Sequence, residues 1–95
     1  MEQEAKQTKG KTQWHLMPLK MLEGIINVRE FGTTKYKDPN NWKEVDPYYY
    51  IDAIIRHANS LQQGEIIDKE SGLHHGHHIA CGALFLTELM KEAKK

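Results

Sequence analysis

Four histidines fall within five positions of the chain, at His74, His75, His77 and His78. On a helix, His75 and His78 lie on the same face because they are three residues apart. Neutral imidazole binds divalent transition metals, and helical bundles can place Glu-x-x-His pairs around a central metal. The pair is therefore a candidate metal site, and ordinary hydrogen-bonded core histidines explain it equally well.

Two carboxylates, Glu23 and Glu30, flank Asn27 within a narrow arc of a predicted helix. Hard cations such as Mg²⁺ take a few carboxylates and leave room for waters and phosphates. Apolar residues cover several faces of this helix, so we expect it to be buried and its carboxylates to point into an interior cleft or a narrow solvent gap, which favours a functional role for Glu23. A solvated helix face beside Lys20 is the alternative.

A second predicted helix carries Asp52, Arg56 and His57. Asp52 and Arg56 are spaced as a surface ion pair, which contributes little to stability. The planar guanidinium of Arg56 also suits a phosphate group. His57 lies in the apolar stripe of the helix, so a satisfied core histidine is its default interpretation.

The polar connection over residues 32–47 holds Lys35, Tyr36, Asn41 and Trp42. A cation, an amide and two aromatic rings suit a nucleotide, with lysine on phosphate and aromatic stacking on the base. Composition alone favours a simpler role, in which the aromatic rings anchor a long loop to the helices. Long connections in compact domains are often functional.

A shorter loop over residues 64–72 carries three acids and two glycines. Locally, Asp68 and Ser71 are typical of helix-capping residues. Glu70 lies between them.

Three helices must position these residues, and no convincing strand is present. We expect them from Pro18 to about Phe31 before Gly32, from Asp46-Pro47 to Gly64, and from Gly72 or Leu73 toward the C-terminus. The fold class is all-α, a small bundle of about three main helices. The first and third helices are apolar over more than one face, so we expect a homo-oligomer to complete the bundle.

Composition excludes several classes of protein. The 95 residues carry 13 basic and 13 acidic side chains, and this zero net charge argues against a nucleic-acid polymer as partner. No apolar run approaches the ~18 residues of a membrane span. The polar N-terminus is unlike a secretory signal, and the single cysteine fits an intracellular setting. We expect a flexible polar arm over residues 1–13 and a single helical domain over residues 14–95.

Several short blocks occur together in one order: FG-x-x-KY, NW, an RH pair, GE-x-x-D-x-ESGL and H-x-x-H. In this combination, about residues 14–89 resemble the phage-type dATP/dGTP diphosphohydrolases. These are related to the MazZ enzymes and more loosely to the all-α MazG-like nucleotide pyrophosphohydrolases. No E-x-x-E motif occurs, so the tandem of E-x-x-E and E-x-x-D typical of standard MazG proteins is absent, and their metal geometry cannot be carried over.

The resemblance implies metal-dependent cleavage of a purine deoxynucleoside triphosphate, dGTP or dATP, to its monophosphate and pyrophosphate in the cytoplasm, that of the host if a phage encodes the chain. It also implies roles for the residues above. His57 and Glu70 would be catalytic, with His57 as general base or water-positioning group. Substrate would be bound by Lys35, Tyr36, Asn41, Trp42 and Arg56. A divalent metal, Mg²⁺ or Mn²⁺ rather than Zn²⁺, would be bound by Glu23, Asp68, His75 and His78.

Three other functions fit parts of the pattern. A phage protein that sequesters a signalling nucleotide without hydrolysing it would keep the cationic and aromatic pocket and lose the metal ligands. A His/Asp phosphohydrolase ranks lower, because no His-Asp dipeptide occurs. A structural Zn²⁺ site needs four ligands in closed geometry, and these are not evident.

Overall fold

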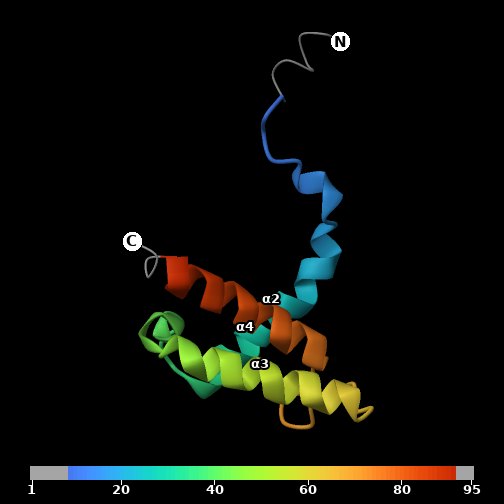
Figure 1. The fold of residues 1–95 in the computed structure, drawn as a ribbon, viewed down its shortest axis with the longest axis vertical. Coiled ribbons are helices and arrows are strands. Elements are labelled where there is room, and N and C mark those ends of the chain that lie inside the picture. The colour runs from blue at the N-terminus through green and yellow to red at the C-terminus, as the bar shows by residue number, and fades with distance from the viewer. Residues whose placement is uncertain (1–8, 92–95) are drawn as a thin grey trace.

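Helix α4, His75–Lys91, packs against α3, Pro47–Gln62, and crosses α2, Leu19–Lys35 (Figure 1). This computed structural model describes residues 9–91. Two short 3₁₀ helices complete it, η1 at Trp14–Leu16 and η2 at Asn41–Glu44. Within residues 9–91 the only β pairing is an isolated bridge between Ile67 and His74. The predicted all-α bundle is confirmed.

Helix α2 ends later than the sequence predicted, at Lys35 instead of about Phe31. Gly32 does not take the left-handed conformation that ends a helix, and its carbonyl accepts a hydrogen bond from Tyr36 N at 2.8 Å. The hydroxyls of Thr33 and Thr34 donate to carbonyls one turn back. The extension puts Lys35 in the last turn of α2.

Helix α3 begins as predicted. The Asp46 carboxylate caps it by accepting from Tyr48 N at 3.0 Å, and Pro47 occupies its first turn. The helix stops just before Gly64, whose φ of +91° is left-handed.

Helix α4 begins at His75, later than the predicted start at Gly72 or Leu73. Gly72 has a φ of +73°, so it turns the chain instead of opening a helix. Backbone bonds from Asp68 N to Leu73 O and from His75 N to Ile66 O then close the 64–74 loop. This loop is held against the start of α4.

Where α2 crosses α4, Gly24 of α2 lies against His77 of α4. A Cβ at Gly24 would overlap the imidazole of His77, so only glycine lets the ring lie against the α2 backbone. His77 therefore packs at the helix crossing, on the far side of α4 from His75.

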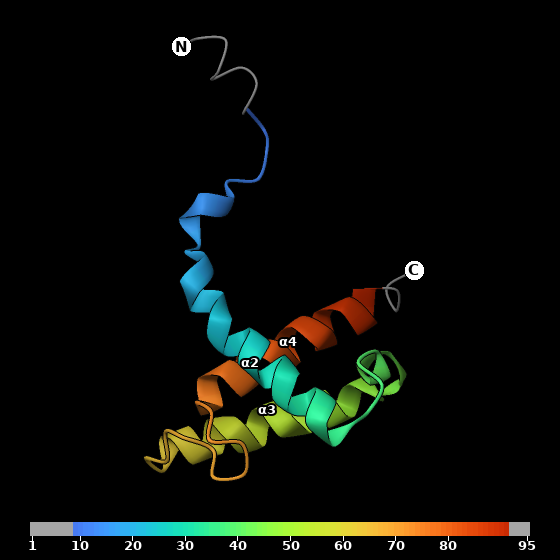
Figure 2. The same ribbon diagram turned by 180° about the vertical axis from the view of Figure 1, so that it is seen from behind.

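Burial within the single chain is slight, and the expectation of a buried first helix is wrong for the part of the chain described. No residue of α2 is buried, and Leu19 is 82% exposed. The first half of α2 and η1 extend away from the other helices (Figure 2). Over residues 9–91, only Cys81 and His75 are buried.

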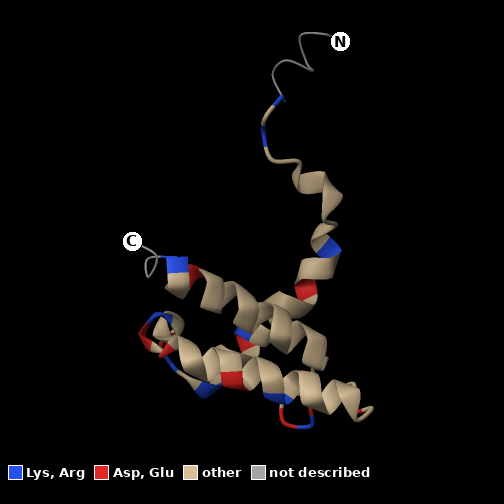
Figure 3. Ribbon diagram, in the orientation of Figure 1, with Lys and Arg blue, Asp and Glu red and all other residues tan. Residues whose placement is uncertain are grey.

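Most of helix α4 carries no Lys, Arg, Asp or Glu. Figure 3 shows none along α4 before its C-terminal end, where Glu88 and Lys91 pair. The charges near α4 therefore come from α2, α3 and the loop 64–74. No helix within residues 9–91 is long and apolar enough to cross a bilayer. Of the predicted arm over residues 1–13, residues 1–8 lie outside the described part of the chain.

Candidate functional site

A cavity of about 540 Å³ lies between the second half of α2, the connection after it, α3 and α4. It is lined by every residue that the sequence predicted for catalysis or substrate binding, and by two of the predicted metal ligands. These residues are Lys35, Tyr36, Asn41, Trp42, Arg56, His57, Asp68, Glu70 and His78. The fold thus brings together side chains from five segments: α2, the connection that holds η2, α3, the loop 64–74 and α4.

Cations line one part of this cavity. Lys35 Nζ lies 3.1 Å from Glu70 Oε2, and this hydrogen bond raises the pKa of Lys35. Arg56 is exposed on α3. Arg29 also lines the cavity and was not predicted from the sequence; its guanidinium donates to Pro39 O at 2.7 Å and lies 5.1 Å from the Phe85 ring centroid. Its signal was a lone cation in a largely apolar part of α2.

Aromatic rings form another part of the wall. Trp42 stacks on Phe85, with centroids 4.7 Å apart and planes 7° from parallel. The Tyr50 hydroxyl donates to Trp42 O at 3.3 Å. Trp42 therefore anchors η2 to α4, as composition favoured, and it also lines the cavity. Tyr36 lines it from the end of α2, with Lys35 Nζ 5.9 Å from its ring.

Three imidazoles gather where α3 meets α4. The rings of His57 and His78 stack, with centroids 4.5 Å apart and planes 9° from parallel. Nδ1 of His57 lies 2.8 Å from Nδ1 of His75. Burial, with the neighbouring imidazoles adding to it, lowers the pKa of His57; burial also lowers the pKa of His78. Both rings therefore favour the neutral form.

His78 is tied to Asp68 through Ser71. The Ser71 hydroxyl donates to Asp68 Oδ2 at 2.7 Å and lies 2.7 Å from Nε2 of His78. A hydroxyl has one hydrogen, so Nε2 of His78 carries the proton of the second bond. Burial raises the pKa of Asp68, but the hydroxyl and backbone N–H of Ser71 outweigh it, and the net pKa is lowered. The predicted helix-capping role of Asp68 and Ser71 is wrong, because both accept hydrogen bonds from backbone N–H groups within the loop, whereas Gly76 N in the first turn of α4 donates to His74 Nδ1 at 2.8 Å.

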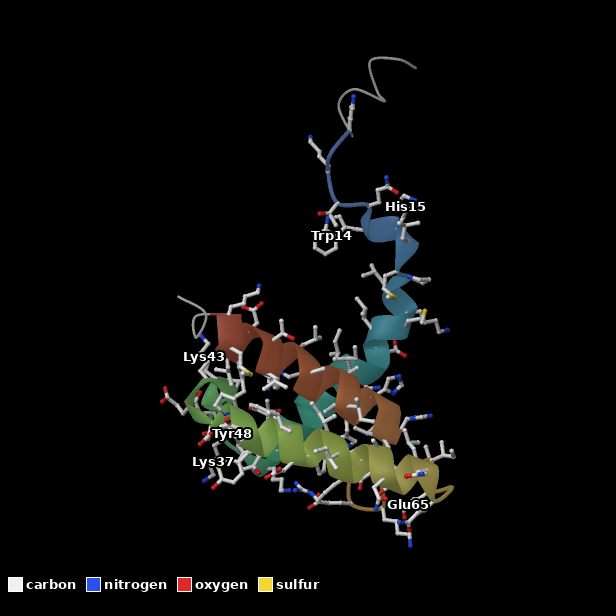
Figure 4. All side chains as sticks on the ribbon, in the orientation of Figure 1. Trp14, His15, Lys37, Lys43, Tyr48 and Glu65 are labelled. Atoms are coloured by element: carbon white, nitrogen blue, oxygen red, sulfur yellow. The ribbon has the colours of Figure 1, made fainter. Side chains whose placement is uncertain are left out.

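His75 lies behind the cavity wall, not in it. Its Nε2 lies 2.8 Å from Glu65 Oε2, while its Nδ1 faces His57. Glu65 follows the end of α3, as Figure 4 shows. Both ring nitrogens of His75 therefore have protein partners. Glu65 belongs to the GE-x-x-D-x-ESGL block that carried the resemblance, but no catalytic, binding or metal role was predicted for it.

The four predicted metal ligands do not lie around one point. Glu23 is exposed and lines a separate open groove of α2, with Lys20, Asn27 and Glu30. No three His, Cys, Asp or Glu side chains within residues 9–91 are grouped as metal ligands. Of the predicted carboxylates, Asp68 and Glu70 line the cavity.

Comparisons with known proteins give one family. The family model described as dATP/dGTP diphosphohydrolase, N-terminal, matches residues 1–95. A dATP/dGTP diphosphohydrolase of Salmonella phage PMBT28 is 32% identical over 81 residues, which are 85% of this chain and 28% of that protein. The chain thus spans less than a third of that relative's length. No solved structure matches.

Proposed function

The chain belongs to the dATP/dGTP diphosphohydrolase N-terminal family, and on that premise we propose that its cavity binds a purine deoxynucleoside triphosphate for hydrolysis. The products are the monophosphate and pyrophosphate. One observation carries the proposal: cations, carboxylates, imidazoles and aromatic rings from five segments line a single cavity. Its volume of about 540 Å³ is within the usual range for small-molecule sites.

The cavity offers separate contacts for the two ends of a nucleotide. Lys35 and Arg56 supply positive charge for the phosphates. Tyr36 and Trp42 supply aromatic surface for the base, and Asn41 supplies an amide beside Trp42. Zero net charge over the chain does not oppose this, because the cations are local.

The proposed reaction is attack of water on the α-phosphorus. The bond from that phosphorus to the oxygen bridging the α and β phosphates breaks, and pyrophosphate leaves. We assign His57 the role of general base, taking a proton from the water, because burial lowers its pKa and so favours the neutral ring near pH 7. Glu70 holds Lys35 at the cavity, so the arriving phosphates compete with Glu70 for that cation.

A divalent metal fits the carboxylates of this cavity better than its imidazoles. Mg²⁺ and Mn²⁺ prefer oxygen ligands, and Mg²⁺ sites often combine one or two carboxylates with substrate phosphates. Asp68 and Glu70 are the residues that would hold it, while both ring nitrogens of His75 are already bonded. When bound, the metal would neutralise phosphate charge and lower the pKa of a bound water.

The test is incubation of the chain with dGTP or dATP in Mg²⁺ or Mn²⁺, followed by anion-exchange chromatography. The proposal expects monophosphate and pyrophosphate in equal amounts. Unchanged nucleotide with every metal, or release of diphosphate and inorganic phosphate, would refute it. Tight calorimetric binding without turnover would favour the nucleotide-sequestering alternative.

We also propose that the chain forms a homo-oligomer. The side chains that support this are apolar and exposed along residues 14–26: Trp14, Leu16, Met17, Leu19, Met21 and Ile26. A surface of this kind is typical of an interface. Light scattering coupled to gel filtration should give a mass above 11.0 kDa, and a monomer at all concentrations would refute the proposal.

A further inference from the structure

The bond network around His75 determines where the proton sits on a neighbouring ring. His75 is 2% exposed, and within residues 9–91 it is the only buried polar side chain. Its Nε2 faces a carboxylate oxygen of Glu65 at 2.8 Å, and its Nδ1 faces Nδ1 of His57 at 2.8 Å. Each short contact must contain one hydrogen, because two lone pairs at this separation repel.

The Glu65 carboxylate can only accept, so Nε2 of His75 carries its hydrogen. A neutral imidazole carries one hydrogen, and Nδ1 of His75 is therefore an acceptor. The hydrogen between the two rings must then belong to Nδ1 of His57. In neutral His57 this leaves a lone pair on Nε2.

That lone pair is open to solvent. No hydrogen-bond partner within the described residues meets Nε2 of His57, and no buried side-chain nitrogen there lacks a partner. An unpartnered nitrogen must therefore reach water. His57 lines the cavity, and stacking on His78 fixes the plane of its ring.

We propose that Glu65 and His75 are positioning residues that hold His57 as its Nδ1–H tautomer, with Nε2 ready to accept a proton. The inference rests on the proposed function for its role in hydrolysis. In that reaction Nε2 of His57 takes one proton from the attacking water, and His57 becomes an imidazolium. The Glu65 charge, acting through His75, stabilises that cation.

Glu65 also has a contact that provides a control. Lys69 Nζ lies 3.7 Å from its other oxygen, Oε1, and the Lys69 side chain is 90% exposed. Loss of Lys69 leaves the bond between Glu65 and His75 in place. A role for Glu65 in surface ion pairing alone therefore predicts the same result for changes at residues 65 and 69.

The experiment compares wild type with Glu65→Gln and Lys69→Gln by ¹⁵N nuclear magnetic resonance of the histidine rings, which distinguishes protonated from unprotonated ring nitrogens. Wild type and Lys69→Gln should show His57 protonated on Nδ1. A side-chain amide can donate as well as accept, so Glu65→Gln should give a mixture of His57 tautomers. The kcat for dGTP should fall roughly ten- to a hundredfold in Glu65→Gln with KM unchanged, as expected for partial loss of a general base.

Two variants of His75 keep the test valid if Glu65→Gln fails to fold. His75→Asn keeps an acceptor close to the position of Nδ1 and should retain the Nδ1–H tautomer, whereas His75→Leu should lose it. The inference would be overturned if wild-type His57 were protonated on Nε2, or if the tautomer of His57 in Glu65→Gln were the same as in wild type. An inactive wild type with the expected tautomers would refute the proposed function and still support the positioning role.

Discussion

Two regions of helix α2 carry the same kinds of side chain and end in different surroundings. From Leu19 to Glu30, one side of the helix presents Lys20, Glu23 and Glu30 along an open groove made by α2 alone. Its end presents Lys35 to a cavity that α3, α4 and the loop 64–74 also line. Carboxylates beside a lysine are thus found in both places.

The difference shows what makes such groups a candidate site. In the groove, both carboxylates are exposed, and water screens their charge. In the cavity, Asp68 and His78 are mostly buried, and bonds through Ser71 fix their positions. Convergence of several segments, and not the spacing of residues on one helix, distinguishes the cavity.

The largest expected effect is on kcat, when the proposed general base His57 is replaced by a residue that cannot accept the proton. His57→Gln should lower kcat for dGTP about 10²- to 10⁴-fold, the usual contribution of a general base. Steady-state kinetics with chromatographic detection of dGMP measures it.

The matched change in the groove is Glu23→Gln, which should leave kcat unchanged. A loss of activity in Glu23→Gln comparable to that in His57→Gln would mean that Glu23 reaches the reacting groups, contrary to the comparison drawn above.

The next effect concerns binding of the phosphates. Lys35→Gln and Arg56→Gln should each raise KM roughly ten- to a hundredfold, because a hydrogen bond to a charged group contributes about 1.5–3 kcal/mol. Lys20→Gln removes the same charge from the groove and should leave KM unchanged. Equal KM values for Lys20→Gln and Lys35→Gln would show that the cavity does not hold the phosphates.

A smaller effect is expected on stability at Gly24, where α2 passes from the groove toward the cavity. Gly24→Ala should lower the free energy of unfolding by about 1–3 kcal/mol, because its Cβ overlaps the His77 ring. In a His77→Ala background the same change should raise it by up to about 1 kcal/mol, since alanine favours helix. Urea unfolding of the four proteins gives both values, and the same sign in both backgrounds would contradict the close crossing.

The smallest effect is a dependence of stability on pH. Burial lowers the pKa of His57 and of His78 below the ordinary 6.5, so the folded state binds fewer protons than the unfolded state just below that pH. Their contribution is fully present above about pH 6.5 and is lost as the pH falls through the lowered values. Tm should therefore decrease between pH 7.5 and 5.5, and less so in His57→Gln than in His15→Asn, which lies outside the cavity. Parallel Tm curves for the two variants would rule out the cluster as the cause.

Much of the fold followed from local signals in the sequence. The bounds of α3 were predicted correctly from Asp46, Pro47 and Gly64, because helix caps and left-handed glycines act within a few residues. The predicted end of α2 was wrong, because Gly32 keeps a helical conformation. The predicted start of α4 was wrong, because residues up to His74 form a loop held by its own backbone hydrogen bonds.

The candidate site was predicted in part. Residue types and the family resemblance selected the side chains that line the cavity. They could not show that α2 leaves Glu23 outside it, since periodicity does not reveal how far a helix extends past its neighbours. They also could not reveal the two contacts that link Glu65 to His75 and His75 to His57, because these residues lie in three different segments.

The most direct measurement of the central claim is where a nucleotide binds. A non-hydrolysable dGTP analogue, titrated into ¹⁵N-labelled protein with Mg²⁺, should shift the amide signals of Lys35, Trp42 and His57 and leave those of Glu23 and Glu30 unchanged. Shifts confined to the groove of α2, or no shifts at millimolar analogue, would contradict the assignment of the cavity as the nucleotide site.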